Sequence, residues 1–272
     1  MLYAARQVLR IIVEARDRRR LRTNVPDLAA ALERSGTAAE RDCWKPIERR
    51  RAELLASADV IPFPEYGAGT LWPGATPGTR RVDELTRVAS KPRRWGEVLF
   101  HLVRTVQPRV ALELGTCVGV SGAYQAAALK LNGAGTLLTF EGAEAAARIA
   151  GQGFRALGLD HHVKQIVGPF AETLPGVLQT IDPIGYAFID GHHEEVATLT
   201  YYRALVAHLD QRALLVFDDI RWSEGMTRAW RTIAEDPAVT VSVDCGSVGI
   251  CLRDPTAPAG RYRVRVSRAR VA

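Results

Sequence analysis

The sequence predicts an α/β protein built on a doubly wound, mostly parallel sheet of seven strands, and three observations predict it. From residue 109 onward, short apolar runs alternate with amphipathic or alanine-rich helical segments, a pattern typical of parallel sheets. Near the C-terminus, two apolar runs are separated by only three residues, which can close a hairpin but cannot hold a crossover helix. Residues 1–57 show the apolar period of helices. We therefore expect a sheet that ends in an antiparallel hairpin, preceded by an N-terminal helical extension.

The elements are expected in the following order. Helices with arginine-rich exposed faces occupy residues 1–57, and residues 60–82, rich in proline and glycine, form a linker or lid. A further pair of helices leads into the sheet. The expected strands are RVALEL (109–114), TLLTFE (136–141), HHVKQIVG (161–168), YAFID (186–190), ALLVFDD (213–219), AVTVSVD (238–244) and VGICLR (248–253). This order predicts a helical extension with lid (1–82), a sheet domain (83–254) and a basic tail (255–272).

The charge distribution argues against a nucleic-acid partner. The chain of 272 residues has a net charge of +6, but residues 105–254 hold 11 Lys/Arg against 17 acids. Enzymes that act on nucleic acids usually line the working groove with positive charge, and here the basic residues are peripheral. No apolar stretch approaches the roughly 20 residues of a membrane span, and the four cysteines show no metal or disulfide spacing. We expect a cytoplasmic protein with reduced thiols and no membrane partner.

Two strand ends predict a ligand site. In LELGTCVGVSG (112–122), Glu113 ends a strand, Gly115 permits a sharp turn and Gly119 opens a helix, so the backbone faces the ligand. The glycines do not form the G-x-G-x-x-G fingerprint of dinucleotide sites, and an acid before the turn suits a cationic ligand. Glu141 closes the next strand, where a carboxylate can accept from both hydroxyls of a ribose. Its alternative role is to cap the following helix.

Three acids lie at the ends of two strands that are expected to be neighbours. Asp190 follows one strand, and Asp218 and Asp219 end the next. Such carboxylates repel one another unless a cation neutralises them, and Mg²⁺ favours oxygen ligands. The sequence therefore predicts a site for Mg²⁺ or another divalent cation. In the alternative interpretation, Asp190 and Asp219 cap the helices that follow them.

Together these features resemble the class I S-adenosylmethionine-dependent methyltransferases over residues 105–254, and the variant ELGTCVG narrows the resemblance to their small-molecule O-methyltransferase branch. The resemblance implies a Rossmann-like methyltransferase fold that binds S-adenosylmethionine. It also implies that the first loop borders the methionine half of this cofactor, that Glu141 binds the ribose and that residues 168–170 border the adenine. The cofactor-binding residues implied in this way are Glu113, Gly115, Thr116, Gly119, Glu141, Gly168, Phe170 and Asp190.

The resemblance extends to the three acids, which match the metal-binding positions of catechol-type and metal-dependent sugar O-methyltransferases. Asp219 stands where the catechol type has Asn, which favours the sugar-type branch. In these families the residue three after the first acid, here His193, is the general base. A metal lowers the pKa of the acceptor hydroxyl and a histidine can take its proton, so Asp190 and His193 are the expected catalytic residues.

The sequence thus predicts divalent-metal-dependent O-methylation of a small hydroxylated molecule, such as a sugar, a polyketide or another secondary metabolite. A metal-independent N- or O-methyltransferase and a non-catalytic cofactor-binding or scaffold protein are the alternatives. Trp222 and His192 are expected to contact the acceptor, although Trp222 can equally be a core or lid aromatic and His192 a histidine at the turn surface. The N-terminal helices cover the acceptor pocket or form the contact of a homodimer.

Overall fold

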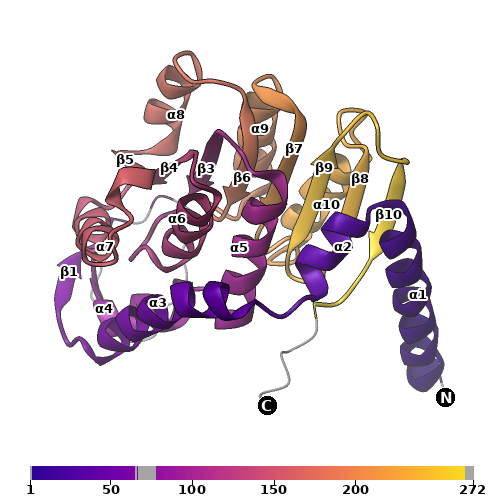
Figure 1. Ribbon diagram of the computed structural model, residues 1–272, viewed down its shortest axis with the longest axis horizontal. Coiled ribbons are helices and arrows are strands. Elements are labelled where there is room, and N and C mark those ends of the chain that lie inside the picture. The colour runs from indigo at the N-terminus through magenta and orange to yellow at the C-terminus, as the bar shows by residue number, and fades with distance from the viewer. Residues whose placement is uncertain (1, 65, 67–77, 267–272) are drawn as a thin grey trace.

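A computed structural model of the chain describes residues 2–64, 66 and 78–266, and its main feature is an eight-stranded sheet in the order β10-β8-β9-β7-β6-β3-β4-β5 (Figure 1). The strands are β3 (Val110–Leu114), β4 (Thr136–Glu141), β5 (Val163–Val167), β6 (Ile184–Ile189), β7 (Leu209–Phe217), β8 (Val241–Asp244), β9 (Gly249–Arg253) and β10 (Gly260–Arg263). All seven expected strands are present, with small differences at their ends.

Strand β9 is the only strand of this sheet that runs against its neighbours, since it pairs antiparallel with both β7 and β8 while the other described pairs are parallel. The predicted mostly parallel sheet with an antiparallel hairpin is therefore confirmed. The sheet has one strand more than expected, because residues 260–263 pair in parallel with β8. These residues lie in the segment for which a basic tail was expected.

Alternate residues of the central strands face two separate apolar layers, as the period of a strand requires. One layer contains Ala111, Tyr186, Phe188, Leu214 and Val216, packed with α2, α3, α5 and α6. The other layer contains Leu112, Leu114, Ala187, Ile189, Leu215 and Phe217, packed with α8, α9 and α10. Because both faces of the sheet are covered, the polar residues that close each strand are left at its carboxyl end, where ligands bind in this class of fold.

The helices are α1 (Leu2–Asn24), α2 (Pro26–Glu33), α3 (Ala38–Ala56), α4 (Val82–Ala89), α5 (Arg93–Val106), α6 (Val120–Asn132), α7 (Glu144–Ala156), α8 (Phe170–Leu178), α9 (Glu195–Val206) and α10 (Glu224–Glu235). Local sequence explains where several of them begin. Thr37 and Glu40 form a capping box at α3, and the Ser223 hydroxyl accepts from the Met226 amide at α10.

The N-terminal helices pack on the sheet domain. Helix α1 lies beside β10 (Figure 1), and α2 contacts α5 while α3 contacts α4 and α6. Trp44 of α3 is fully buried, and its ring meets that of Phe100 on α5 edge-to-face at 5.4 Å. The extension is thus part of the same apolar layer as α5 and α6.

The segment expected to be a linker or lid contains two short antiparallel strands, β1 (Val60–Pro62) and β2 (Thr79–Arg81). Most of the residues between them lie outside the described part of the chain. Among the described residues, every helix is too short or too polar to span a bilayer. The cytoplasmic location stays a prediction.

Replacing Trp44 with alanine tests whether the extension contributes to the stability of the sheet domain. We expect the Trp44→Ala variant to lose about 3–5 kcal/mol of unfolding free energy in urea, since a large buried side chain is removed. Trp222→Ala is the matched control: Trp222 is 52% exposed, so its removal should cost less than about 1 kcal/mol. Equal losses in the two variants would contradict this account of the N-terminal helices.

Candidate functional site

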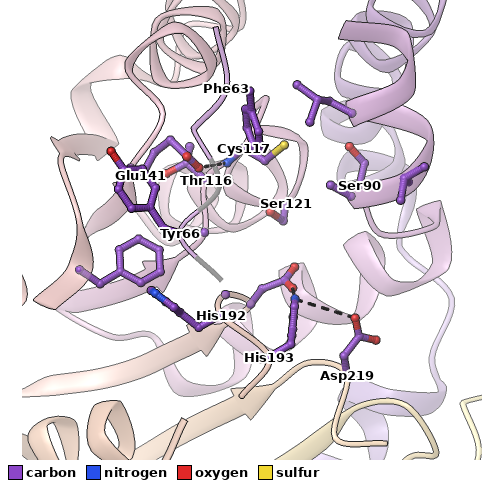
Figure 2. A pocket seen from close by; sticks show the side chains of 18 of the residues that line it. Phe63, Tyr66, Ser90, Thr116, Cys117, Ser121, Glu141, His192, His193 and Asp219 are labelled. Atoms are coloured by element: carbon purple, nitrogen blue, oxygen red, sulfur yellow. Dashed lines mark hydrogen bonds and ion pairs between the residues drawn. The ribbon is translucent and has the colours of Figure 1, made fainter. Parts of the chain in front are cut away.

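A cavity lies at the carboxyl ends of β3 to β7, on the edge of the sheet where the sequence placed its candidate residues. Most of the predicted site residues line it: Gly115, Thr116, Glu141, Phe170, Asp190, His192, His193, Asp219 and Trp222. The remaining four, Glu113, Gly119, Gly168 and Asp218, do not appear among its lining residues. Figure 2 shows the side chains that point into this cavity.

The loop after β3 has a backbone that only glycine allows at two points. Gly115 has φ +108°, and a Cβ there would lie 2.1 Å from the carbonyl oxygen of Asp190. Gly119 has φ +86° at the start of α6, and a Cβ there would lie 2.8 Å from that of Ala150. Gly115 therefore brings the first loop against the end of β6, whereas Gly119 serves the packing of α6 on α7 rather than the cavity wall.

Glu141 connects two strand ends. Its Oε2 accepts a hydrogen bond of 2.7 Å from the amide of Cys117 (Figure 2). Its Oε1 accepts one of 2.8 Å from the amide of Ala143. Ala143 is the N-cap residue of α7, so the carboxylate has the capping role left open by the sequence and also lines the cavity. Burial raises the pKa of Glu141.

Glu113 lies beneath the loop rather than in the cavity wall, which differs from the expectation that it borders the cofactor. Its side chain is completely buried and accepts hydrogen bonds of 2.6 Å from Gln125 and Thr139. Thr139 in turn contacts the hydroxyl of Thr116. Burial raises the pKa of Glu113 to about 7. Glu113 thus holds the loop from below, because this network joins the loop to β4 and α6.

The aromatic wall is built by Phe170, the first residue of α8. Its ring packs edge-to-face against Phe140 and His192, at 6.5 and 5.6 Å between centroids. Gly168 lies just before it, with φ +135°, and its amide donates to the carbonyl of Glu141. Gly168 therefore shapes the turn into α8, whereas Phe170 lines the cavity.

The two histidines point to different parts of the site. His192 contacts the Tyr201 hydroxyl through Nδ1 at 3.0 Å and packs on Phe170, and burial lowers its pKa. His193 points toward the acids: its Nε2 lies 3.7 Å from Asp190 Oδ1 and 4.0 Å from Asp219 Oδ2 (Figure 2). Consecutive left-handed residues, at φ +63° and +48°, produce this divergence.

Two basic side chains, His193 and Lys91, lie beside the three acids. Asp190 and Asp219 flank His193, whereas the carboxylate of Asp218 forms an ion pair with the ammonium of Lys91, which also lies 3.9 Å from Asp219 Oδ1. Burial raises the pKa of Asp190, and the charges of Lys91 and His193 oppose this shift.

A divalent cation needs oxygen ligands that converge on one point. Here the Lys91 ammonium lies against the carboxylate of Asp218, and within the described part of the chain no group of three or more His, Cys, Asp or Glu side chains is arranged to hold a metal. The set of Asp190, Asp218 and Asp219 expected from the sequence therefore does not fit a metal ion in this arrangement.

Trp222 follows the acids and contributes to the wall of the cavity. Its ring lies 6.0 Å from that of His193, and about half of its surface is exposed. This position is consistent with the expectation that Trp222 contacts the acceptor, and it differs from that of a core aromatic.

Several lining residues were missed by the sequence analysis. Lys91, Tyr66 and the residues of α4 that face the cavity come from segments treated as linker and connecting helices. The ring of Tyr66 lies against Gly142, so that a Cβ at this glycine would be 2.5 Å away. The sequence signals only that acids at adjacent strand ends favour a cation, and it does not indicate that Lys91 supplies it.

A family described as "Methyltransferase domain" matches residues 112–220. The chain carries a methyltransferase domain. The resemblance inferred from the sequence, to the class I S-adenosylmethionine-dependent methyltransferases, is thereby confirmed. No curated protein matches the chain.

Solved structures share the fold of the methyltransferase domain. The O-methyltransferase TomG from Streptomyces achromogenes, involved in tomaymycin synthesis and solved with S-adenosylmethionine, is 22% identical with a TM-score of 0.53, covering 61% of this chain and 82% of its own. An O-methyltransferase from Bacillus cereus, in complex with S-adenosylhomocysteine, is 20% identical with a TM-score of 0.52, covering 61% and 83%. The methyltransferase PaMTH1 from Podospora anserina is 14% identical with a TM-score of 0.55, covering 81% and 89%.

The buried carboxyl of Glu113 makes the stability of the methyltransferase domain depend on pH. Because its pKa is raised from 4.5 to about 7 on folding, the folded state binds this proton more tightly than the unfolded state. The stabilisation is complete below about pH 4.5 and is lost as the pH rises through about 7. Relative to Glu113→Gln, the wild type should lose up to about 3 kcal/mol across this range in urea unfolding. A stability difference that does not change with pH would contradict this assignment.

Proposed function

We propose that this protein transfers the methyl group of S-adenosylmethionine to a hydroxyl of a small molecule, with His193 as the general base. The observation that carries the proposal is the environment of His193 Nε2. This atom faces the cavity between Asp190 and Asp219, at distances longer than hydrogen bonds, and the His193 ring makes no hydrogen bond with the described residues. An imidazole nitrogen in this position is available to accept a proton.

The cavity residues fit the cofactor. The backbone of Gly115 and Thr116 faces the cavity, and the two oxygens of Glu141, each bonded to one amide, keep lone pairs for ribose hydroxyls. Phe170 offers an aromatic edge to an adenine. Acids at the strand ends favour a positively charged ligand. When bound, the cofactor supplies a methyl group on a positively charged sulfur, which needs a deprotonated oxygen as its nucleophile.

In this proposal His193 activates the acceptor hydroxyl by removing its proton. Its Nε2 takes the proton of the acceptor hydroxyl, the oxygen forms the new bond to the methyl carbon as the carbon–sulfur bond breaks, and the electron pair stays on sulfur. The carboxylates of Asp190 and Asp219, each within 4.0 Å of Nε2, stabilise the positive charge that the ring acquires. This is the electrostatic part of general base catalysis.

The walls beyond His193 favour an acceptor with a large apolar surface. Leu85, Val88 and Ala89 of α4 face the cavity together with Trp222. A planar aromatic or polyketide-like molecule with one hydroxyl near His193 fits these walls better than a free sugar does, because a sugar would leave polar groups without partners. We propose a role in secondary metabolism on this basis.

The ion pair of Lys91 with Asp218 favours the metal-independent form of the reaction over the metal-dependent form expected from the sequence. A second cation at this point would meet the repulsion of the ammonium group. His193 at the cavity also favours an enzyme over a non-catalytic cofactor-binding protein.

Activity in the presence of a chelator tests the role of metal. With a panel of phenolic acceptors, we expect S-adenosylhomocysteine to form at the same rate with EDTA as with added Mg²⁺, since the protein supplies its own cation. The product is measured by mass spectrometry. A rate that falls with EDTA and returns with Mg²⁺ would restore the metal-dependent mechanism.

Replacing His193 tests the proposed base. We expect His193→Gln to lower the rate by about 100-fold or more while calorimetry shows unchanged binding of S-adenosylhomocysteine, because the side chain acts on the acceptor. His161→Gln is the matched control, since His161 is exposed near the opposite end of β5. A His193→Gln variant that keeps full activity rules out this base, and a wild type that does not bind the cofactor rules out the proposed function.

A further inference from the structure

Lys91 lies in the short connection between α4 and α5, and its ammonium group contacts the carboxyl ends of the sheet. It pairs with Asp218, whose side chain is completely buried, and it lies 3.9 Å from Asp219 Oδ1. The Lys91 side chain is itself only 17% exposed and lines the cavity. The ion pair thus joins a segment of the cavity wall to the end of β7.

The ion pair with Lys91 is the contact that stabilises the ionised form of Asp218. Apart from the pair with Lys91, neither carboxylate oxygen of Asp218 accepts a hydrogen bond from the described part of the protein. A buried carboxylate without a partner is strongly unfavourable, and removing its partner leaves that charge uncompensated. An ionised Asp218 therefore needs a cation at this position, whether or not a ligand is bound.

The N-terminal extension holds Lys91 in place. The guanidinium of Arg51, on α3, donates a 2.6 Å hydrogen bond to the carbonyl of Lys91 and also pairs with Glu48 at 3.0 Å. The Arg51 side chain is mostly buried. The backbone of Lys91 is thus held by a residue of α3, 40 positions earlier in the chain.

Lysine is rare in this chain, which has four lysines and 32 arginines. The two side chains differ in a way that matters here. An ammonium group is a compact point charge on a flexible stem, whereas a guanidinium is a wide planar fork. The compact ammonium of Lys91 lies beside both Asp218 and Asp219, as a metal ion would.

We propose that Lys91 is a positioning residue that takes the place of the divalent cation at the strand ends. It neutralises Asp218 and Asp219, keeps metal ions away from the three acids, and fixes the carboxylates around His193. The assignment concerns the same site as the proposed function, and its link to methyl transfer rests on that proposal. The replacement of a metal ion by the Lys91 ammonium does not rest on the proposed function, since metal binding can be measured without cofactor or acceptor.

The experiment measures Mn²⁺ and Mg²⁺ binding to the metal-free protein by calorimetry and by thermal unfolding. We expect the wild type to bind neither ion at the strand ends and to keep its midpoint temperature. Lys91→Ala leaves three acids without their cation, so it should bind Mn²⁺ at least about tenfold more tightly than the wild type and gain thermal stability from it.

Two controls separate this effect from general loss of charge. Lys45→Ala removes an exposed lysine paired with Asp42 and should behave as the wild type does. The double variant Lys91→Ala/Asp218→Asn removes a ligand as well and should lose the Mn²⁺ binding gained by Lys91→Ala. A structural role alone would lower the stability of Lys91→Ala without this response to metal.

Two outcomes would overturn the proposal: binding of Mn²⁺ by the wild type that Asp218→Asn abolishes, or a folded Lys91→Ala variant that binds no more Mn²⁺ than the wild type. If Lys91→Ala does not fold without metal, the wild-type titration still tests the proposal, because Mn²⁺ binding at Asp218 in the wild type would overturn it. Folding of the variant on addition of Mn²⁺ would support the proposal. Metal binding by Lys91→Ala together with a wild type that does not bind S-adenosylmethionine would keep this inference and reject the proposed function.

Discussion

The buried charge of Asp218 at the end of β7 is the constraint on which the site depends. Parallel strands bring Asp190, Asp218 and Asp219 to one edge of the sheet, and the carboxylate of Asp218 has no access to water. A cation at this edge allows the buried Asp218 to stay ionised. Lys91 supplies it, and the connection between α4 and α5 is thereby fixed against the strand ends. Helix α4, three residues of which line the cavity, leads into this connection.

Backbone strain is concentrated in the same region. Among the described residues, five non-glycine residues have positive φ angles, and four of them line the cavity: Cys117, His192, His193 and Asp219. Such conformations cost of order 1–3 kcal/mol each and persist where the surrounding structure determines them. Here the networks of Glu113 and Glu141 and the packing of both apolar layers provide that support. The strained turns aim His193 toward the acids and His192 toward the aromatic wall.

The N-terminal helices belong to the site as well as to the core. Trp44 packs α3 into the layer formed by α5 and α6, and Arg51 of the same helix bonds the carbonyl of Lys91. A helix outside the matched methyltransferase domain thus connects the apolar core to the charge balance at the strand ends. This gives the extension a physical role at the site, although none of the described residues that line the cavity comes from α1, α2 or α3. The homodimer contact stays a prediction.

The sequence by itself determined the sheet, its antiparallel strand and the edge at which the site lies, because apolar runs and the residues that end them are local properties of the chain. It also determined that Glu141, Asp190 and His193 face one cavity, since carboxyl ends of parallel strands meet at one edge. Only the tertiary structure decided how the charge there is balanced. Lys91 is 127 residues from Asp218 in the chain, and no local pattern shows that the packing of α3, α4 and α5 brings its ammonium to that carboxylate. For the same reason the burial of Glu113 beneath its loop followed from packing that the residue order does not reveal.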